Sequence, residues 1–462
     1  MSRAIDATRP ADLHRQLGGG LHPVPIRRVW IGADGPAELA RRAADLAGGG
    51  PVLLVCDETP KRRDGADLDE QLMAALGPRV ALTVKRLAAG PDGELHADLA
   101  GAQALGTEAA DYALLISAGS GTVTDLVKYA RHLAAPAAAF LCYPTAASVT
   151  AFGSALAVLL LDGVKRTLPA RPPDEIVCDL PTLCAAPPRL TRAGFGDVIA
   201  RSVSYGDWWL AEQLGLADGF TPVAGELLAG AEQAMIDLAQ DVAVGGPAGT
   251  RAVIEALLLA GYAMSLVGQT APLSGWEHVI SHWLDMTAAH DGRRCALHGE
   301  QVGVATLVAA RAYEAAWPQL DLDRLTADWT AGDQAAYERE LRAVFDAVDP
   351  SGAMTAECWR DAQTKLARWR AARPQRREFA RRWAAGELEA ELHAAVRPAA
   401  EVASALARAG APERFEELSQ PVGREQAVAA VAHAHMVRAR FTLGDLLAMT
   451  GWLSGREAQL LG

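Results

Sequence analysis

The first part of the chain alternates between short apolar runs and amphipathic segments, and this alternation limits the fold more than any other feature. Segments with helical periodicity lie at 37–47, 99–109 and 124–135. The apolar runs between them are typical of short buried strands and lie at 27–32, 51–58, 79–87, 112–120 and 138–144. Strands and helices that alternate at this spacing predict a parallel sheet with helices packed on it, an α/β fold.

The texture of the sequence changes after this region. Residues 155–180, ALAVLLLDGVKRTLPARPPDEIVCDL, predict two further strands around a Pro-rich turn. From PTLCAAPPRLT (181–191) onward the chain consists of long amphipathic segments rich in Ala, Leu, Arg and Trp, with few strand candidates. We therefore predict an α/β domain over residues 1–187 and an all-helical domain over residues 188–462.

Composition narrows the function classes. The chain carries 44 basic and 56 acidic residues, a net charge of −12, which disfavours a nucleic-acid or anionic-membrane binder because either needs a basic face. The opening MSRAIDATRPADLHRQL has no apolar core of a secretory signal, and no run of apolar residues is long and uncharged enough for a membrane span. The six cysteines form no C-x-x-C pair. We expect a soluble cytoplasmic protein with reduced thiols and a small-molecule substrate, binding neither nucleic acid nor membrane.

A strand, a glycine-rich turn and a helix follow one another in DYALLISAGSGTVTDLVKYAR (111–131). Gly119 and Gly121 allow a ligand close to the backbone, and the N-terminus of the next helix favours a phosphate. The pattern is neither G-x-G-x-x-G nor a P-loop, so a diphosphate cradle and a plain strand-to-helix turn both fit. Asp57 ends a strand where ligands collect in open α/β sheets, or it is simply a turn former.

Two histidines stand four residues apart in SGWEHVISHWLDM (274–286), on one face of a predicted helix. A metalloprotease is excluded because the glutamate of H-E-x-x-H is absent between them. His278 and His282 are therefore either ordinary helix histidines or part of a site that needs further ligands from elsewhere. Asp197, at a probable helix start, and His298, at a turn, could supply them, although an N-cap and a structural histidine are the plainer interpretations. His433 and His435 are interpreted as helix-surface residues.

Seven segments occur in register and together resemble the sn-glycerol-1-phosphate dehydrogenase family, particularly its bacterial members. That family belongs to the wider group of metal-dependent alcohol dehydrogenases, glycerol dehydrogenase and dehydroquinate synthase, and the resemblance covers roughly residues 25–455. The segments are SAGSGTVTDLVKY, YPTAASVTAFGS, DGVKRTLPARPP, AGFGDVIARSVSYGDWWLA, SGWEHVISH, LHGEQVGVATL and VRARFTLGDLLAMTGWL. The resemblance implies a dehydroquinate synthase-like two-domain fold, with a nucleotide-binding α/β domain, a helical domain and an active site in the cleft between them.

The resemblance also implies roles for individual residues. The residues that match the family's cofactor contacts are Asp57, Gly119, Ser120, Gly121, Thr122, Val123, Thr145, Ser148 and Ser154. The glycine turn would hold the NAD(P) diphosphate, and an acid at Asp57, beside the adenosine ribose, would favour NAD over NADP. The metal ligands match Asp197, His278 and His298, whereas His282 matches a histidine that contacts the substrate. Asp197 and His282 are thus the expected catalytic residues.

One segment departs from the family. In the family, the second residue after the Ser of P-T-x-x-S is usually an Asp that contacts the substrate, and a Gly follows it. In PTAASVTAFGS these two positions are Thr150 and Ala151. The Thr150 hydroxyl can donate and accept a hydrogen bond but carries no charge, so the substrate can differ from that of the family, and the sequence does not determine its identity. The pair Lys165–Arg166 matches the family and suits an anionic substrate or the cofactor phosphates, although a solvated turn fits equally well.

The expected function is a metal-dependent oxidoreductase that uses NAD or NADP to interconvert a small, phosphorylated or otherwise anionic, alcohol and its ketone or aldehyde, like glycerol 1-phosphate and dihydroxyacetone phosphate. Zinc is the first choice for one carboxylate and two imidazoles, with nickel, iron and manganese as alternatives. Competing hypotheses are a dehydroquinate-synthase-like lyase or cyclase that regenerates its NAD, a reductase for a different carbonyl in a specialised biosynthetic pathway, and a non-catalytic binding protein. A homodimer or higher homo-oligomer is compatible with any of these.

Overall fold

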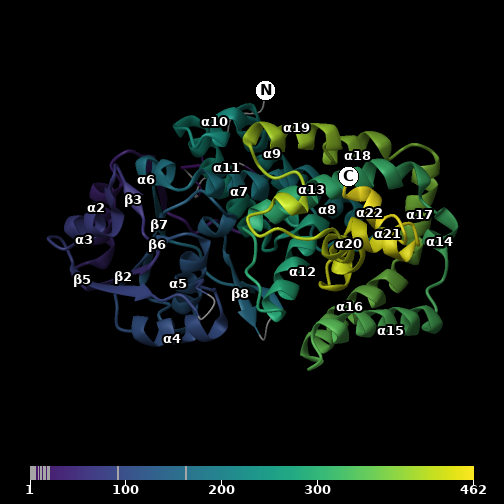
Figure 1. Ribbon diagram of the computed structural model, residues 1–462, viewed down its shortest axis with the longest axis horizontal. Helices are drawn as coiled ribbons and strands as arrows, with labels where there is room; N and C mark the ends of the chain where they lie inside the picture. The colour runs from purple at the N-terminus through teal and green to yellow at the C-terminus, as the bar shows by residue number, and fades with distance from the viewer. Residues whose placement is uncertain are drawn as a thin grey trace.

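The structure, a computed structural model, describes residues 7, 8, 10, 13, 17, 21–90, 93–161 and 164–462. Most of the opening segment on which the absence of a signal sequence was argued lies outside these residues. Figure 1 shows strands gathered in the N-terminal part, coloured purple to blue, and a larger mass of helices formed by the green and yellow remainder of the chain. The predicted fold class, an α/β domain followed by an all-helical one, is confirmed.

The main sheet has six parallel strands in the order β1-β10-β7-β6-β2-β5. In the four inner strands β10, β7, β6 and β2, apolar residues on alternate positions bury both faces, which is why these strands read as almost continuous apolar runs. One face packs on α2 (Gly35–Ala47) and α3 (Leu68–Leu76), the other on α4 (Leu99–Ala109) and α5 (Gly121–Ala134). The strands are β1 (Arg28–Gly32), β2 (Pro51–Asp57), β5 (Ala81–Leu87), β6 (Leu114–Gly119), β7 (Ala139–Pro144) and β10 (Glu175–Asp179).

The prediction of two strands in residues 155–180 is wrong. This segment forms three: β8 (Leu156–Leu161) and β9 (Val164–Pro169) pair antiparallel as a separate hairpin, and only β10 joins the main sheet. The proline-rich stretch connects β9 to β10. The hairpin has its own sequence signal, the dipeptide Asp162–Gly163, which is typical of two-residue hairpin turns. A second small hairpin, β3 (Arg62–Arg63) with β4 (Ala66–Asp67), was also not predicted.

No strand occurs among the described residues beyond β10. The division at residue 187 stays a prediction, and it falls between the end of β10 at Asp179 and the start of α7 at Pro188. The α-helices that follow are α6 (Leu180–Ala185), α7 (Pro188–Ile199), α8 (Arg201–Gln213), α9 (Pro222–Asp237), α10 (Ala239–Ala243), α11 (Pro247–Val267), α12 (Trp276–His290), α13 (His298–Ala316), α14 (Leu322–Thr326), α15 (Ala331–Val348), α16 (Ala353–Ala371), α17 (Arg373–Ala384), α18 (Glu389–Ala395), α19 (Ala399–Ala409), α20 (Arg424–His433), α21 (Leu443–Met449) and α22 (Glu457–Leu460). Short 3-10 helices are η2 (Thr150–Phe152), η3 (Ala271–Leu273), η4 (Trp317–Gln319), η5 (Phe415–Glu417) and η6 (Ala434–Met436).

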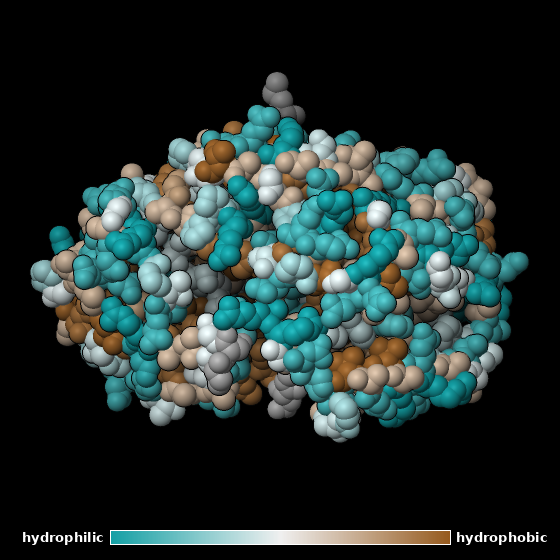
Figure 2. Space-filling model, in the orientation of Figure 1, coloured by the Kyte–Doolittle hydropathy of each residue, from teal (hydrophilic) through white to brown (hydrophobic). Residues whose placement is uncertain are grey.

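Helix α11 is the core of the helical part. It has 21 residues, and its most apolar window of 18 residues has a mean hydropathy of 1.4, apolar enough to cross a membrane, but 78% of that window is buried inside the molecule. Such burial is typical of the central helix of a soluble protein. Figure 2 shows a face covered largely by hydrophilic residues. His435 is also buried, only 4% exposed, so its assignment to a helix surface was wrong: the chain after α20 turns inward through η6.

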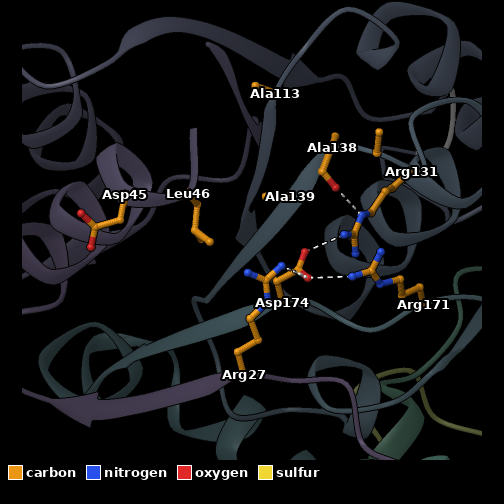
Figure 3. A pocket seen from close by; sticks show the side chains of 10 residues that line it. Arg27, Asp45, Leu46, Ala113, Arg131, Ala138, Ala139, Arg171 and Asp174 are labelled. Atoms are coloured by element: carbon orange, nitrogen blue, oxygen red, sulfur yellow. Dashed lines mark hydrogen bonds and ion pairs between the residues drawn. The ribbon is translucent and has the colours of Figure 1, made fainter. Parts of the chain in front are cut away.

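Ion pairs stabilise the edge of the main sheet at which its strands begin. Arg27, Arg131 and Arg171 converge on the carboxylate of Asp174, at distances of 3.1, 2.6 and 2.9 Å (Figure 3). Asp174 also accepts the backbone N–H of Phe140 in β7 at 2.9 Å. The cavity of about 280 Å³ beside these residues thus lies where β7 and β10 start, at the opposite edge from the strand ends where ligands collect in such sheets.

Candidate active site

Three helices bring one carboxylate and two imidazoles together. Asp197 lies on α7, His278 on α12, and His298 is the first residue of α13. Glycines allow α7 and α13 to approach backbone to backbone: a Cβ at Gly196 would lie 2.1 Å from the carbonyl oxygen of Gly299, and a Cβ at Gly299 would lie 1.8 Å from that of Ala193. No side chain fits in this space, so the glycines around Asp197 and His298 determine the separation of the two helices.

The ligand atoms of these three residues form a compact group. Oδ1 of Asp197 lies 3.3 Å from Nε2 of His278 and 3.9 Å from Nε2 of His298, and all three atoms lie within 4.8 Å of one another. Oδ1 is buried and makes no hydrogen bond of normal geometry with any described residue. The other oxygen, Oδ2, accepts the backbone N–H of Thr150 at 3.1 Å. A buried carboxylate oxygen facing two imidazole nitrogens fits a divalent cation that takes N and O ligands.

Each histidine of the group is held through its other ring nitrogen. Nδ1 of His278 lies 2.9 Å from Oε1 of Glu277, a buried carboxylate that also accepts the backbone N–H of Gly275. Nδ1 of His298 lies 3.0 Å from Oγ of Ser281, whose hydroxyl donates to Gln301. With Nδ1 engaged, Nε2 of both rings is directed at Asp197. This arrangement of supporting groups is the one that orients metal-binding histidines in proteins.

The charges of the group are strongly coupled. Burial opposes a charge on His278, but its contacts with Asp197 and Glu277 outweigh this and raise its pKa to about 9. Burial lowers the pKa of His298 well below its usual value. Burial alone would raise the pKa of Asp197, whereas its contact with His278 and the charges of both histidines bring that pKa below the usual range. A cation bound here would replace the proton on His278.

His282 lies one helical turn beyond His278, outside the compact group. Its ring is stacked with that of His298 at a centroid distance of 6.1 Å and lies 6.4 Å from that of His278. Its Nδ1 lies 3.3 Å from Nη2 of Arg438, a residue that the sequence did not single out. Burial, reinforced by the positive charge of Arg438 and Lys165, lowers the pKa of His282 well below the usual value. His282 is therefore a neutral imidazole.

The two basic residues of β9 have different surroundings. Nζ of Lys165 lies 2.7 Å from Oδ2 of Asp285, and Oδ1 of Asp285 accepts from Gln301. Lys165 is thus joined to the same hydrogen-bond network as His298. The guanidinium of Arg166 instead pairs with Glu357 and Asp361 on α16. The structure brings Lys165 to the histidines and ties Arg166 to acids of another helix.

The residues matched to cofactor contacts gather where three neighbouring strands end. Asp57, Gly119 and Thr145 close or follow β2, β6 and β7, and the backbone N–H of Thr145 donates to Gly119 at 3.1 Å. The turn Gly119–Val123 leads into α5, and a Cβ at Gly121 would lie 2.4 Å from the side chain of Val149. Thr145, Ser148 and Ser154 are buried, and Ser154 accepts from the backbone of Leu156. Asp57 accepts from Lys61 at 2.7 Å.

Several residues of the site escaped the sequence-based prediction. Glu277 and Ser281 lie inside the histidine segment itself, and Arg438 lies in the VRAR segment quoted above, so their positions in these segments were the available signal. Asp285 and Gln301 also lie inside quoted segments, SGWEHVISHWLDM and LHGEQVGVATL, but nothing in these segments marks them as partners. Their place in the network depends on the packing of α12 against α13, which no local pattern encodes.

The chain is similar to known dehydrogenases in sequence and in fold. The family model of iron-containing alcohol dehydrogenase matches residues 37–187. The glycerol-1-phosphate dehydrogenase (NAD(P)+) of Bacillus subtilis (strain 168) is 31% identical over 322 residues, which are 68% of this chain and 79% of that protein. The enzyme of the same name from Bacillus licheniformis is 28% identical over 436 residues, 94% of this chain and 92% of its own length. Among solved structures, a probable glycerol dehydrogenase from Sinorhizobium meliloti 1021 aligns with a TM-score of 0.55 at 18% identity, covering 93% of this chain and 97% of its own.

Proposed function

This chain belongs to the glycerol-1-phosphate dehydrogenase family and is a metal-dependent NAD(P) oxidoreductase, and we propose that it interconverts glycerol 1-phosphate and dihydroxyacetone phosphate, or a closely similar phosphorylated pair. The observation that carries the proposal is the group formed by Asp197, His278 and His298, with its unpartnered Oδ1. We propose zinc as the resident ion, with nickel, iron and manganese as alternatives, because one carboxylate and two imidazoles suit all four. When bound, the ion supplies Lewis-acid polarisation of the substrate oxygen.

The protein's own residues perform the remaining tasks. Glu277 and Ser281 fix the rings of His278 and His298, so that the ligand atoms need little reorganisation. His282 accepts from Arg438 through Nδ1, which leaves the proton on Nε2. In the direction of ketone reduction, His282 donates this hydrogen bond to the substrate oxygen. In the direction of alcohol oxidation, the same Nε2–H donates to the substrate oxygen and stabilises the negative charge that develops on it.

The cofactor binds, in this proposal, where strands β2, β6 and β7 end. The turn Gly119–Val123 and the start of α5 face the diphosphate, Thr145, Ser148 and Ser154 face the nicotinamide half, and Asp57 faces the adenosine ribose. NAD is the preferred cofactor in this proposal because the carboxylate of Asp57 repels a 2′-phosphate. The neighbouring Lys61 weakens that preference. A cytoplasmic location, a homodimeric or larger assembly and the absence of nucleic-acid and membrane partners remain predictions.

A turnover assay tests the proposal. Protein stripped of metal by a chelator is supplied with dihydroxyacetone phosphate and NADH or NADPH, with and without added zinc or nickel. We expect oxidation of the reduced cofactor that depends on the metal and matches the product formed. Product formed without net cofactor oxidation would indicate the cyclase type of reaction instead, and turnover only with an uncharged or different carbonyl would reject the proposed substrate.

Two variants and a matched control assign the metal ligands. His278→Ala and Asp197→Ala should lose metal binding and turnover while the circular dichroism spectrum stays that of a folded protein. His290→Ala removes an exposed histidine from the same helix, α12, and should bind metal and turn over as the wild type does. Full activity of metal-free His278→Ala would reject the ligand assignment.

A further inference from the structure

Lys165 and Arg438 lie near His282, and Arg166 lies near Arg438. Carboxylates neutralise Lys165 and Arg166. Lys165 pairs with Asp285, and Arg166 pairs with Glu357 and Asp361. The third, Arg438, has no carboxylate within ion-pair distance among the residues that the structure describes. Its Nη2 donates to the backbone oxygen of Lys165 and lies 3.3 Å from Nδ1 of His282.

Unused donors beside His282 set Arg438 apart from the arginines that stabilise the fold. Arg131, which is 2% exposed, donates to Asp174 and to two backbone carbonyls (Figure 3). Arg440, two residues beyond Arg438, uses its two Nη atoms on Ser274 and Thr270. Arg438 instead keeps part of its guanidinium unused in a partly buried position.

Such an arrangement has an electrostatic cost. Burial and the nearby positive charges of Arg166 and Arg440 outweigh the more distant carboxylate of Asp361 and lower the pKa of Arg438 to about 10, so it is still a cation at neutral pH. A partly desolvated cation without a counter-ion destabilises the folded protein unless something supplies the opposite charge. A ligand can supply that charge, and a guanidinium matches the oxygens of a phosphate in geometry as well as in charge.

The position of Arg438 indicates which ligand supplies the opposite charge. Only the side chain of His282 separates Arg438 from the metal-ligand group: His282 contacts Arg438 and stacks on His298. A substrate whose oxygen lies at the metal ligands and His282 can therefore direct an anionic end toward Arg438. Lys165, close to the same histidines, adds to the positive potential of this end of the site.

We propose that Arg438 binds the phosphate group of the substrate and selects phosphorylated over uncharged trioses. The inference rests on the proposed function, because it identifies the residue that recognises the anionic end of that substrate. Arg438 also keeps Nδ1 of His282 as an acceptor, so phosphate binding and the orientation of His282 depend on the same guanidinium.

Substrate pairs that differ only in the phosphate test this inference. For Arg438→Ala, KM for dihydroxyacetone phosphate should rise roughly 10- to 100-fold, the range expected for losing charge-assisted hydrogen bonds. KM for dihydroxyacetone should stay within about twofold of the wild-type value, since this substrate has no charge for Arg438 to recognise. Arg438→Lys retains the positive charge but loses the planar, two-pronged guanidinium, so its KM for dihydroxyacetone phosphate should lie between those of the wild type and Arg438→Ala. Arg368→Ala removes an exposed arginine that pairs with Asp218 and serves as the control.

A binding measurement keeps the inference independent of turnover. Inorganic phosphate, titrated by calorimetry into the metal-loaded wild type, should bind at least about tenfold more tightly than to Arg438→Ala. Equal phosphate affinity of the two proteins, or an equal rise of KM with both trioses, would overturn the role of Arg438 in phosphate recognition. An equal fall of kcat with both trioses is the expected result of losing its contact with His282. If the wild type turns over no triose at all but binds phosphate through Arg438, the proposed substrate fails and the anion site stands.

Discussion

Thr150 donates its backbone N–H to Oδ2 of Asp197 over 3.1 Å, which links the loop after β7 to the carboxylate of the metal-ligand group. The buried Lys128 of α5 holds this loop by donating to the carbonyl oxygens of Ala151 and Leu156. One oxygen of Asp197 is therefore engaged by the α/β part, and the other is left for a ligand. Although Thr150 stands where the resemblance leads us to expect an aspartate, the contact with Asp197 uses the backbone N–H and does not depend on the side chain.

Thr150→Pro should weaken metal binding by roughly 10- to 100-fold, the usual effect of removing a group that orients a metal ligand. Proline removes the N–H that holds Oδ2, yet it is tolerated as the first residue of a helical turn. Val149, just before it, already has the extended conformation that a following proline requires, with φ −156° and ψ 163°. The zinc dissociation constant, measured by competition with a chromophoric chelator, checks this.

Thr150→Val is the matched control because it retains the N–H and the branched shape and removes only the hydroxyl. Its zinc affinity should stay within about threefold of the wild type. A loss as large as that of the proline variant would mean that the hydroxyl, rather than the backbone, supports the site.

Gly299→Ala should destabilise the protein and weaken metal binding together. The new Cβ would lie 1.8 Å from the carbonyl oxygen of Ala193, so α13 must move away from α7 and carry His298 with it. Overpacking of this kind costs about 1–3 kcal/mol or more. Urea unfolding and zinc titration measure the two effects.

Gly230→Ala provides the comparison within a helix. Gly230 is exposed in α9, and nothing lies within 4 Å of its added Cβ, so alanine should stabilise the helix by about 0.5–1 kcal/mol. Equal stability of both variants would show that α7 and α13 can separate without cost.

The sequence predicted the main sheet because its four inner strands are buried on both faces and read as apolar runs. The hairpin β8–β9 was misassigned because the proline-rich stretch is a stronger turn signal than Asp162–Gly163. The helix α3 was not predicted at all; it buries only Leu68, Leu72 and Leu76. Local patterns thus identified elements with a large apolar surface and failed for the small ones.

The candidate site shows the same division. Asp197, His278 and His298 come from segments that resemble known ones, and the structure brings them together. Their distances depend on backbone contacts such as that of Gly196 with Gly299, about a hundred residues apart, which no local pattern contains. Arg438 could not be singled out either, because its missing counter-charge becomes visible only when the partners of Lys165 and Arg166 are known.

Lys61→Ala should lower the efficiency of NADPH and leave that of NADH nearly unchanged. Lys61 lies 2.7 Å from the carboxylate of Asp57 and partly neutralises it. Without Lys61 the carboxylate faces a 2′-phosphate with its full charge, so kcat/KM for NADPH should fall about tenfold relative to NADH. Initial rates with both cofactors give the ratio.

Lys85→Ala controls for the loss of a lysine near this edge of the sheet. Lys85 lies on the neighbouring strand β5 and pairs with Glu108 rather than Asp57. Its NADPH-to-NADH ratio should equal that of the wild type. If Lys61→Ala lowers kcat/KM for NADPH and for NADH by the same factor, Lys61 contributes to cofactor binding in general and does not discriminate between the two cofactors.

Acidification should destabilise the protein through His435, which is not one of the proposed metal ligands. Burial, reinforced by the charge of Lys365, lowers the pKa of His435 well below its usual 6.5. Below pH 6.5 the unfolded chain therefore binds a proton that the folded protein excludes, and the free energy of unfolding falls as the pH falls. Above that pH both states hold the ring neutral, and His435 contributes no pH dependence. For one such histidine the slope is about 1.4 kcal/mol per pH unit.

His435→Gln removes this titrating group and should flatten the acid limb of the stability profile by that slope, even if its stability at neutral pH is lower. Urea unfolding at several pH values between about 5 and 8 measures the free energy for both proteins. His290→Gln, which replaces an exposed histidine on α12, should keep the slope of the wild type. Parallel profiles for the wild type and His435→Gln would show that His435 binds a proton equally in the folded and unfolded states, because only a difference in proton binding between the two states produces the slope.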